Sequence, residues 1–571
     1  MMYVSICIDV NLVIGHTYFI AAAQAVSGSR ANAATHIEEV RDIERNMTEP
    51  VPKRMKLSES NDDETTNSTT SLLAEFRSVS NESSEATPTF EGKTLNLPSN
   101  STPKQLNELL NKLMGSEVNE KYAFYVSDDA VPEKEELGRV VKDTGISTET
   151  VVTIKYQKLA SFRVRAVSRC TDSMPGHSGA VLHVSFSGDG RLLASGGADC
   201  VLRIWDVHTG TPKHICRGHR SHILQVSWSP TAEWIATGDL DGQVKVWDPK
   251  TGKLKSNFRG HKKWITSIAW EPLQAEGSKG ERFATSSKDK TIKIFNVRTG
   301  QSLVTLSGHR DSVESVRWGC EGYIYSCSRD RTLFTHLTRS SHPATHSPIH
   351  SLNTGTINVW KASQNKADLG RFVRSLRGHA HRVNALASSS DFIGRSGPFD
   401  HKGATFKTIE EACQLAKERY RKMKYGEERL VSCSDDHTLY LWSPTKTAKP
   451  IARLTGHQQQ VTHVSFSPDG RFIASASFDK KVKLWDGYTG KFLKTFTGHV
   501  SAVYQVCWSP DSTMLASGSK DSTVKVWSVR TFKRLTNCPG HADEVYALDW
   551  APNGQRVASG SKDRLVKMWR S

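Results

Sequence analysis

The chain has 571 residues, of which 37% are hydrophobic, and its 76 Lys and Arg outnumber its 59 Asp and Glu, which gives a formal net charge of +17. This length can hold one large domain and a smaller one, and the positive charge favours nucleic acid or an RNA-rich particle over a membrane, with a basic surface kept for solubility as the alternative. The ten cysteines form no CxxC pair and no cluster at metal-ligand spacing. They predict reduced, mostly buried thiols in a cytosolic or nuclear protein and exclude a zinc-binding module.

The first 88 residues predict an N-terminal extension without a folded domain. Residues 1–26 imitate a secretory signal, but they lack a basic start and contain Asp9, and a wrongly assigned start codon explains them equally well. Their apolar run is too interrupted to span a membrane. Residues 27 to about 88 are rich in Ser, Thr, Asn and Glu, which predicts disorder. Within them, Lys53, Arg54 and Lys56 resemble a short nuclear import signal.

Residues 89–158 have the pattern of a small α+β domain. A strand in "GKTLNL" precedes a helix whose start is marked by Thr102 as N-cap, Pro103 at the first helical position and Gln105 of a capping box. Two further strands follow, "YAFYV" and "TVVTIKY", with an acidic stretch between them. This order outlines a β-grasp, ubiquitin-like domain.

Residues 159–571 consist of one repeated unit. The dipeptide Gly-His occurs eight times, and successive histidines lie 42, 42, 48, 70, 78, 42 and 42 residues apart. This period is that of WD-repeat propeller blades, with insertions in the middle of the array. Each unit ends in an aromatic residue, and seven units carry an Asp six residues before it. The fold class is therefore mainly β, with an eight-bladed WD-repeat propeller after the β-grasp domain and the N-terminal tail.

In WD-repeat proteins, which these units resemble, a Ser, a His, an Asp and a Trp tie each blade together through side-chain hydrogen bonds. In the unit from Gly498 to Trp527 these would be Ser517, His499, Asp521 and Trp527. Buried indole and imidazole groups need such partners. The corresponding candidates elsewhere are His177, His219, His261, His457, His541, Asp199, Asp241, Asp563, Trp205, Trp247, Trp485 and Trp569. Because a catalytic triad is needed once whereas this set recurs in every unit, we predict a structural role and no enzymatic activity.

Three further features concern the ends and the insertions of the repeat array. The last unit lacks an outer strand after Trp569, and Phe162–Val167 can supply it. Residues 333–356 interrupt the fourth unit, and their removal restores "SRDRTINVW", so we interpret them as a splice insert. Residues 391–428 of the fifth unit predict an amphipathic, basic helix outside the ring, which either contacts RNA or a partner or packs on the rim.

The chain resembles the Notchless family. The resemblance rests on a β-grasp module before eight WD units, on "FRVRAVSRCTDSMPGH" at the junction, on "DFIGRSG" in the fifth unit, and on "SASFDKKVKLWDG" and "GHADEVYALDWAPNGQRVASGSKD" near the end. It implies a nuclear and nucleolar assembly factor of the large (60S) ribosomal subunit that is also linked to Notch signalling. The implied partners are the pre-60S particle, with its rRNA and ribosomal proteins, a midasin-type AAA ATPase and a Notch pathway component, with neither a membrane nor a small-molecule substrate.

The resemblance also implies a role for the acidic stretch after "YAFYV". In this family a Glu at this place binds the Mg²⁺ of midasin's adhesion site, so the chain needs no cofactor of its own and shares the partner's metal. An ungapped match puts Ala130 at the position of that Glu. Either Asp129 takes its role, or a longer loop brings Glu133 to the metal, or the stretch is an ordinary solvated turn. Mg²⁺ prefers hard oxygen ligands, which either carboxylate provides.

We therefore expect a non-enzymatic assembly factor of the large ribosomal subunit. The alternative is a signalling scaffold or a substrate receptor of a ubiquitin ligase, in which the ubiquitin-like domain recruits the ligase and the propeller binds a peptide. A propeller hydrolase would need one blade that departs from the repeat with its own nucleophilic or acidic cluster, and the sequence has none.

Overall fold

The structure is a computed structural model, and it describes residues 71–78, 94–114, 120–126, 129–131, 136–146, 150–159, 162–330, 355–365, 368–401, 405–423 and 427–571. Lys53, Arg54 and Lys56, Glu133, residues 1–26 and nearly all of 333–356 lie outside these ranges. Among the described helices, none combines the length and the apolar character that a membrane crossing requires.

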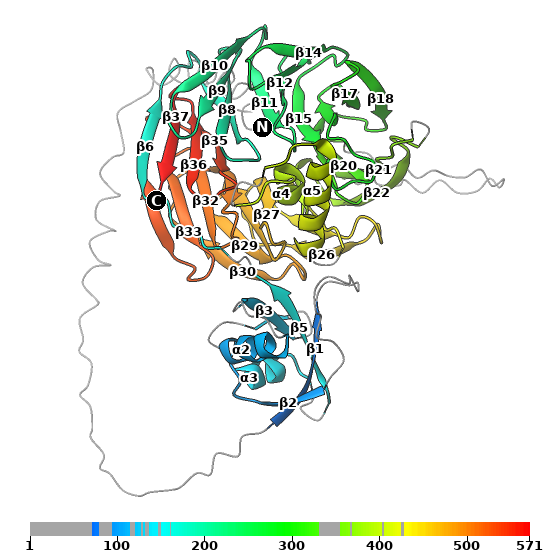
Figure 1. Ribbon diagram of the computed structural model, residues 1–571, viewed down its shortest axis with the longest axis vertical. Helices are drawn as coiled ribbons and strands as arrows, with labels where there is room; N and C mark the ends of the chain where they lie inside the picture. The colour runs from blue at the N-terminus through cyan, green and yellow to red at the C-terminus, as the bar shows by residue number, and fades with distance from the viewer. Residues whose placement is uncertain are drawn as a thin grey trace, which may run out of the picture. The chain divides into compact units, whose positions relative to one another are not determined.

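The first module is a five-stranded sheet with two helices (Figure 1). Its elements are β1 (Ser71–Ser78), β2 (Thr94–Pro98), α2 (Pro103–Leu113), β3 (Tyr122–Val126), β4 (Asp129–Ala130), α3 (Leu137–Asp143) and β5 (Val152–Lys158). The strands lie in the order β2-β1-β5-β3-β4, and β1 runs parallel to β5. Leu106 and Leu110 of α2 bury their side chains in the core of this module. The capping box forms as expected, because the Thr102 N–H donates to Gln105 Oε1 at 2.9 Å.

The boundary at residue 89 is wrong, because Ser71–Ser78 forms β1, which lies between β2 and β5 in this sheet. Leu72, Ala74 and Phe76 alternate on its buried face, whereas the residues between them are exposed or only partly buried. This alternation is short and includes a small alanine, so the surrounding Ser-rich composition concealed it. The strand β4 and the helix α3 also lie where the sequence predicted only a loop.

The second module consists of eight four-stranded antiparallel sheets (Figure 1). Blades 1 to 4 are formed by β7 (Val181–Phe186), β8 (Leu192–Gly197), β9 (Val201–Asp206) and β10 (Pro212–Arg217); β11 (Ile223–Trp228), β12 (Ile235–Asp239), β13 (Val244–Trp247) and β14 (Leu254–Phe258); β15 (Ile265–Trp270), β16 (Arg282–Ser287), β17 (Thr291–Asn296) and β18 (Gln301–Ser307); and β19 (Val313–Trp318), β20 (Tyr323–Ser328), β21 (Gly355–Lys361) and β22 (Phe372–His379).

Blades 5 to 8 follow the same order along the chain, except that the outer strand of blade 8 comes from before blade 1. Their strands are β23 (Val383–Ser388), β24 (Leu430–Ser434), β25 (Leu439–Trp442) and β26 (Pro450–Leu454); β27 (Val461–Phe466), β28 (Phe472–Ser477), β29 (Val482–Asp486) and β30 (Phe492–Phe496); β31 (Val503–Trp508), β32 (Met514–Ser519), β33 (Val524–Ser528) and β34 (Arg534–Cys538); and β35 (Val545–Trp550), β36 (Arg556–Ser561), β37 (Val566–Arg570) and β6 (Arg169–Met174).

The eight first strands form a closed ring. Each contacts the first strand of the next blade, from β7 through β11, β15, β19, β23, β27 and β31 to β35, and β35 contacts β7 again. Apolar side chains fill the space between neighbouring sheets; Trp527 of blade 7, for example, packs among residues of blades 6 and 7. The eight-bladed propeller predicted from the Gly-His period is therefore the fold that the chain adopts.

The ring closes through β6, and the sequence placed this strand a few residues too early. β6 pairs antiparallel with β37, so that Trp569 lies opposite Cys170. Of the predicted strand Phe162–Val167, the side chains of Val164 and Val167 are buried in the core of blades 7 and 8 instead. The Val164 N–H donates to Asp511 Oδ2 at 2.7 Å, which joins this segment to the turn between β31 and β32 of blade 7.

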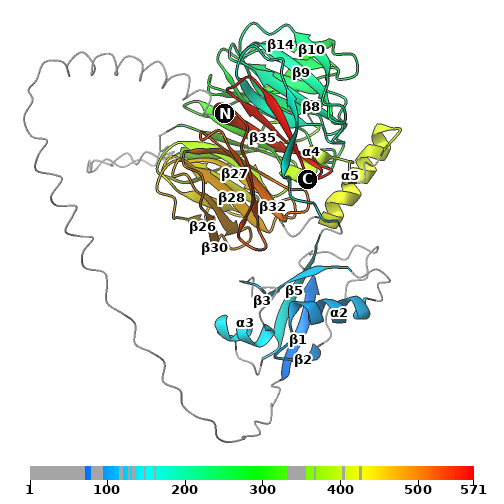
Figure 2. The ribbon, with the colours of Figure 1, turned by 90° about the vertical axis from the view of Figure 1, so that its left-hand side faces the viewer.

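The insertion in blade 5 contains two helices, α4 (Asp391–Ser396) and α5 (Ile409–Met423). Figure 2 shows α5 beside the ring, in agreement with the predicted amphipathic helix, whose Ala412 and Ala416 pack against Leu273. The short α4 was not expected. Its Arg395 forms an ion pair with Asp549 of β35 at 2.8 Å, so this insertion connects blade 5 with blade 8.

Candidate functional site

The repeated polar residues meet inside each blade, and blade 7 shows the arrangement. His499 Nδ1 lies 2.8 Å from Asp521 Oδ2, and its Nε2 lies 2.8 Å from Ser517 Oγ. The indole of Trp527 donates from Nε1 to the same Ser517 Oγ at 2.8 Å. A neutral imidazole satisfies every partner if its Nδ1–H donates to the carboxylate and its Nε2 accepts from the serine hydroxyl. The four side chains then form one relay of hydrogen bonds.

The histidine, hydroxyl and carboxylate of this network recur in all eight blades, and the indole recurs in seven of them. The Nδ1 to carboxylate distances are 2.7–3.1 Å and the Nε2 to hydroxyl distances are 2.7–2.9 Å. Its members, in the order histidine, hydroxyl and carboxylate, are His177, Ser195 and Asp199; His219, Thr237 and Asp239; His261, Thr285 and Asp289; His309, Ser326 and Asp330; His379, Ser432 and Asp436; His457, Ser475 and Asp479; His499, Ser517 and Asp521; and His541, Ser559 and Asp563. The indoles of Trp205, Trp247, Trp360, Trp442, Trp485, Trp527 and Trp569 donate to these hydroxyls.

Blade 3 differs from the others because Phe295 stands where they have Trp. Thr285 therefore receives no indole hydrogen bond, and its hydroxyl lies 2.9 Å from His261 Nε2. Asp289 also accepts from the Thr291 hydroxyl at 2.6 Å and from the Lys262 N–H at 2.9 Å. The carboxylate thus joins the histidine to the backbone of the loop that follows it.

In blade 2 the predicted Asp241 is wrong, and Asp239 takes its place. Asp239 Oδ2 lies 2.8 Å from His219 Nδ1, and Asp239 is fully buried at the end of β12, whereas Asp241 is exposed. Asp239 Oδ1 also accepts the backbone N–H of Asp241 and Gln243. Asp239, two residues earlier along the chain, reaches the same histidine from the end of the strand. The expected spacing of six residues between the Asp and the aromatic residue therefore fails in blade 2, although the bond between histidine and carboxylate is kept.

The protonation states follow from burial and hydrogen bonding. Burial lowers the pKa of His499 by more than Asp521 raises it, and the pKa values of His219, His457 and His541 are lowered in the same way. Burial alone would raise the pKa of Asp521, but hydrogen bonds from His499 and Thr523 outweigh it and hold this pKa well below its ordinary value. At neutral pH the relay consists of a neutral imidazole and an ionised carboxylate.

This arrangement is suited to stabilising a blade rather than to chemistry. The Ser517 side chain is fully buried and bonded to two rings, so a substrate carbonyl has no access to its oxygen. Within the described ranges, no group of three or more His, Cys, Asp or Glu residues is arranged to hold a metal ion. The histidine, hydroxyl and carboxylate side chains that recur through the sequence are bonded to one another inside the blades.

The acidic stretch begins in a short hairpin of the β-grasp module. Asp129 lies on β4 opposite Val126 of β3, and Ala130 lies opposite Tyr125. The Val131 N–H donates to the Phe124 carbonyl at 2.9 Å, which holds the chain after the hairpin. The backbone of Asp129 is therefore fixed by strand pairing rather than lying in a long loop, whereas Glu133 falls outside the described residues.

Sequence reasoning missed a group of basic residues around the network of blade 3. Lys262, Lys263 and Trp264 follow its histidine, and Lys288 and Lys290 flank its aspartate. The segments "GHKKW" and "SKDK" carried the signal, since no other unit has as many cations beside these two network residues.

Comparison with known proteins agrees with this architecture. The family model "WD domain, G-beta repeat" matches residues 168–206, 210–248, 252–296, 300–334, 448–486, 490–528 and 532–570, and the model "NLE (NUC135) domain" matches residues 73–134. The Notchless protein homolog of Arabidopsis thaliana is 46% identical over 408 residues, which are 71% of this chain and 79% of that protein. The chain belongs to the Notchless family.

Two further relatives and one structure complete the comparison for this Notchless-family chain. Protein Notchless of Drosophila melanogaster is 41% identical over 423 residues, which are 73% of this chain and 78% of that protein. Ribosome assembly protein 4 of Saccharomyces cerevisiae is 55% identical over 130 residues, which are 22% of this chain and 25% of that protein. The computationally designed Ika8 protein superposes with a TM-score of 0.51 at 26% identity, covering 70% of this chain and 98% of that one. The repeat model passes over blade 5, which nevertheless forms the full network.

Proposed function

We propose that this chain is a non-catalytic assembly factor of the large ribosomal subunit, and that its propeller docks on the pre-ribosomal particle. The observation that carries the proposal is membership of the Notchless family over both modules, together with 55% identity to a protein named Ribosome assembly protein 4 over 130 residues. Two physical features support it. The recurring polar residues are buried in blade networks, and the net charge of +17 suits an RNA-rich partner.

We further propose that the β-grasp module presents a carboxylate to the adhesion site of a midasin-type AAA ATPase. Asp129 is the first candidate and Glu133 the second, and either would complete the coordination of an Mg²⁺ that the ATPase holds. The pairing of Asp129 with Val126 supports this role, because a strand held by backbone hydrogen bonds can transmit a pulling force without first unravelling. The metal would supply a cationic anchor, and this chain would contribute only the oxygen ligand.

The proposal places the protein in the nucleus and nucleolus, with Lys53, Arg54 and Lys56 as the import signal. A contribution to Notch signalling, through a component of that pathway, is a separate proposal that rests on the family resemblance alone.

Sedimentation of cell extracts tests the main proposal. We expect the full chain to migrate with large pre-ribosomal particles at low salt and to be released as the salt concentration rises, since contacts to phosphates weaken steeply with ionic strength. Migration only in small complexes at every salt concentration would contradict the proposal and favour a signalling scaffold or a ligase substrate receptor.

Binding of the purified full chain to the isolated adhesion domain tests the carboxylate. Asp129→Ala should abolish binding that depends on Mg²⁺ if Asp129 is the ligand, and Glu133→Ala should do so if Glu133 is. Glu108→Ala, which removes an exposed carboxylate from α2, is the matched control and should leave binding unchanged. If neither of the first two substitutions weakens binding, the metal-ligand proposal is wrong.

A further inference from the structure

The loops of blade 3 beside its histidine network form a compact basic surface. We call it the blade-3 surface and define it by Lys262, Lys263 and Trp264, which precede β15, and by Lys288 and Lys290, which lie between β16 and β17. Lys262, Lys263 and Lys290 are exposed, and Trp264 and Lys288 are partly exposed. Four cations and one aromatic ring therefore lie on two adjacent loops.

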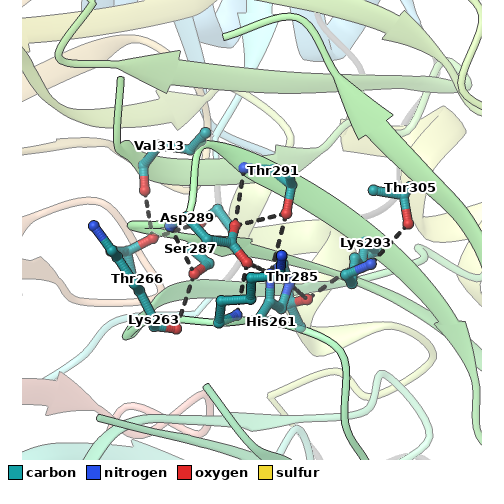
Figure 3. Close-up of polar contacts among 12 residues, drawn as sticks. His261, Lys263, Thr266, Thr285, Ser287, Asp289, Thr291, Lys293, Thr305 and Val313 are labelled. Atoms are coloured by element: carbon teal, nitrogen blue, oxygen red, sulfur yellow. Dashed lines mark hydrogen bonds and ion pairs between the residues drawn. The ribbon is translucent and has the colours of Figure 1, made fainter. Parts of the chain in front are cut away.

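The buried network holds these loops in place. The Lys262 N–H donates to Asp289 Oδ2 at 2.9 Å. Ser287 Oγ donates to the Lys263 carbonyl at 2.9 Å (Figure 3). The Lys288 N–H donates to the Trp264 carbonyl at 3.0 Å, which joins the two loops directly. A ligand would therefore meet a backbone that is already ordered, and binding would cost little additional conformational entropy.

One acid of these loops, Asp289, bonds through its carboxylate to His261 and to the Lys262 N–H. Among the residues that the structure describes, Lys262, Lys263 and Lys290 have no carboxylate in ion-pair contact. The equivalent loops of blades 7 and 8 differ, because Lys520 lies 3.7 Å from Glu544 and Lys562 lies 3.4 Å from Asp543. Blade 3 thus offers positive charge to an external partner, whereas blades 7 and 8 pair much of theirs internally.

Three further cationic residues, Lys245, Arg220 and Arg259, extend the positive charge of this surface toward blade 2. Burial lowers the pKa of Lys245, and the nearby Arg259 and Arg220 lower it further, although Asp239 opposes them. Both arginines are exposed. Like charges gathered at this density repel one another, and a bound polyanion would relieve that repulsion.

The aromatic ring distinguishes among polyanions. The Lys288 ammonium lies 3.7 Å from the centroid of the Trp264 ring, in a cation–π contact that leaves the ring partly exposed. An exposed ring among lysines suits a single-stranded nucleic acid, whose unpaired bases stack on aromatic side chains while its phosphates contact the cations. A duplex keeps its bases stacked within the helix, and none of the large exposed hydrophobic side chains that a membrane surface would require lies on these two loops.

We propose that the blade-3 surface binds single-stranded RNA, with Trp264 stacking on a base and Lys262, Lys263 and Lys290 contacting phosphates. The proposal deepens the assembly function above and rests on it for the identity of the ligand, an unpaired rRNA segment. The network around His261 and Asp289 then has a second use, since it orders the loops that carry the binding residues.

Fluorescence anisotropy with the purified full chain and a short labelled oligouridine tests the proposal. Trp264→Leu keeps an apolar side chain at this partly buried position and should weaken binding about tenfold, as expected for the loss of one stacked base. The triple variant Lys262→Ala, Lys263→Ala, Lys290→Ala should lower the slope of log Kd against log salt concentration by about two, since each phosphate contact to a single strand contributes roughly 0.7. The three lysines are exposed, so this variant should fold normally.

The double variant Lys520→Ala, Lys562→Ala is the matched control, because it removes surface lysines that already have carboxylate partners. It should leave both the affinity and the salt slope nearly unchanged. The inference is overturned if this control weakens binding as much as the blade-3 variants do, if Trp264→Leu has no effect, or if an RNA duplex or anionic lipid vesicles bind the surface as tightly as the oligouridine.

The two proposals fail separately. If the chain sediments with pre-ribosomal particles but its affinity for oligouridine does not depend on Trp264, only the blade-3 surface is refuted. If oligouridine binding depends on Trp264 but no particle association occurs at low salt, the surface stands and the assembly function is refuted.

Discussion

The network of blade 7 predicts a specific cost for removing one hydroxyl group. In Ser517→Ala, the Trp527 indole N–H loses the Ser517 Oγ acceptor and His499 Nε2 loses its hydroxyl partner, both at positions buried from water. A buried polar group left without a partner costs about 1–3 kcal/mol, so we expect the two losses together to lower the free energy of unfolding by about 3 kcal/mol. Ser517→Thr should cost less than about 1 kcal/mol, because Thr237 and Thr285 fill the same place in blades 2 and 3.

A double-mutant cycle separates the two contributions. Trp527→Phe reproduces the natural state of blade 3, where Phe295 offers no N–H. In that background Ser517→Ala affects only the histidine, and its cost should fall to about half, which corresponds to a coupling energy of about 1–2 kcal/mol. Urea denaturation of the full chain, followed by tryptophan fluorescence and circular dichroism, measures all four variants. Equal costs for Ser517→Ala in the two backgrounds would refute the proposed relay.

Three further predictions concern blade 2, acid stability and the thiols. Asp239→Asn should destabilise the propeller by about 2–4 kcal/mol because it removes the buried partner of a histidine, whereas Asp241→Asn should be nearly neutral, as denaturant titration can show. Folding lowers the pKa values of four network histidines and of several network aspartates, so the unfolded chain takes up protons before the folded chain does as the pH falls. The free energy of unfolding should therefore be constant above about pH 7, fall below about pH 6.5 as the histidines titrate, and fall more steeply below about pH 4 as the aspartates titrate. A gain in stability between about pH 7 and about pH 5 would contradict this account. With Ellman's reagent, the exposed Cys170 should react in the folded protein, whereas the buried Cys433 and Cys507 should react only in denaturant.

The repeat made the propeller predictable from the sequence. A motif that recurs at a fixed spacing reports one local structure eight times, so a departure in one blade does not conceal the pattern in the others. The departures followed from geometry. Asp239 and Asp241 both stand near the end of β12, and only three-dimensional reach decides which of them meets His219. The closing strand was misplaced by a few residues because Val164 and Val167 are apolar enough to suggest a strand, although they fill a core.

The β-grasp module and the blade-3 surface were harder to predict for a different reason. β1 contains only three buried side chains, and its partner β5 lies far along the chain, so neither composition nor local period distinguishes it from the tail. The lysines of blade 3 are ordinary surface residues when considered one at a time. Their significance depends on which loops the fold brings together and on the fact that, among the described residues, Lys262, Lys263 and Lys290 form no ion pair with a carboxylate. The sequence alone contains neither of these facts.

The pairing of β6 with β37 also sets the order of events during synthesis. Blade 8 combines the first strand of the ring to leave the ribosome with the last, so the other seven blades are made while this sheet is still incomplete. Until β37 emerges, β36 and β6 each present an unpaired edge, which is an attractive template for another chain. A chain truncated before β37 should therefore leave blade 8 incomplete, with the edges of β36 and β6 open to pairing with another chain.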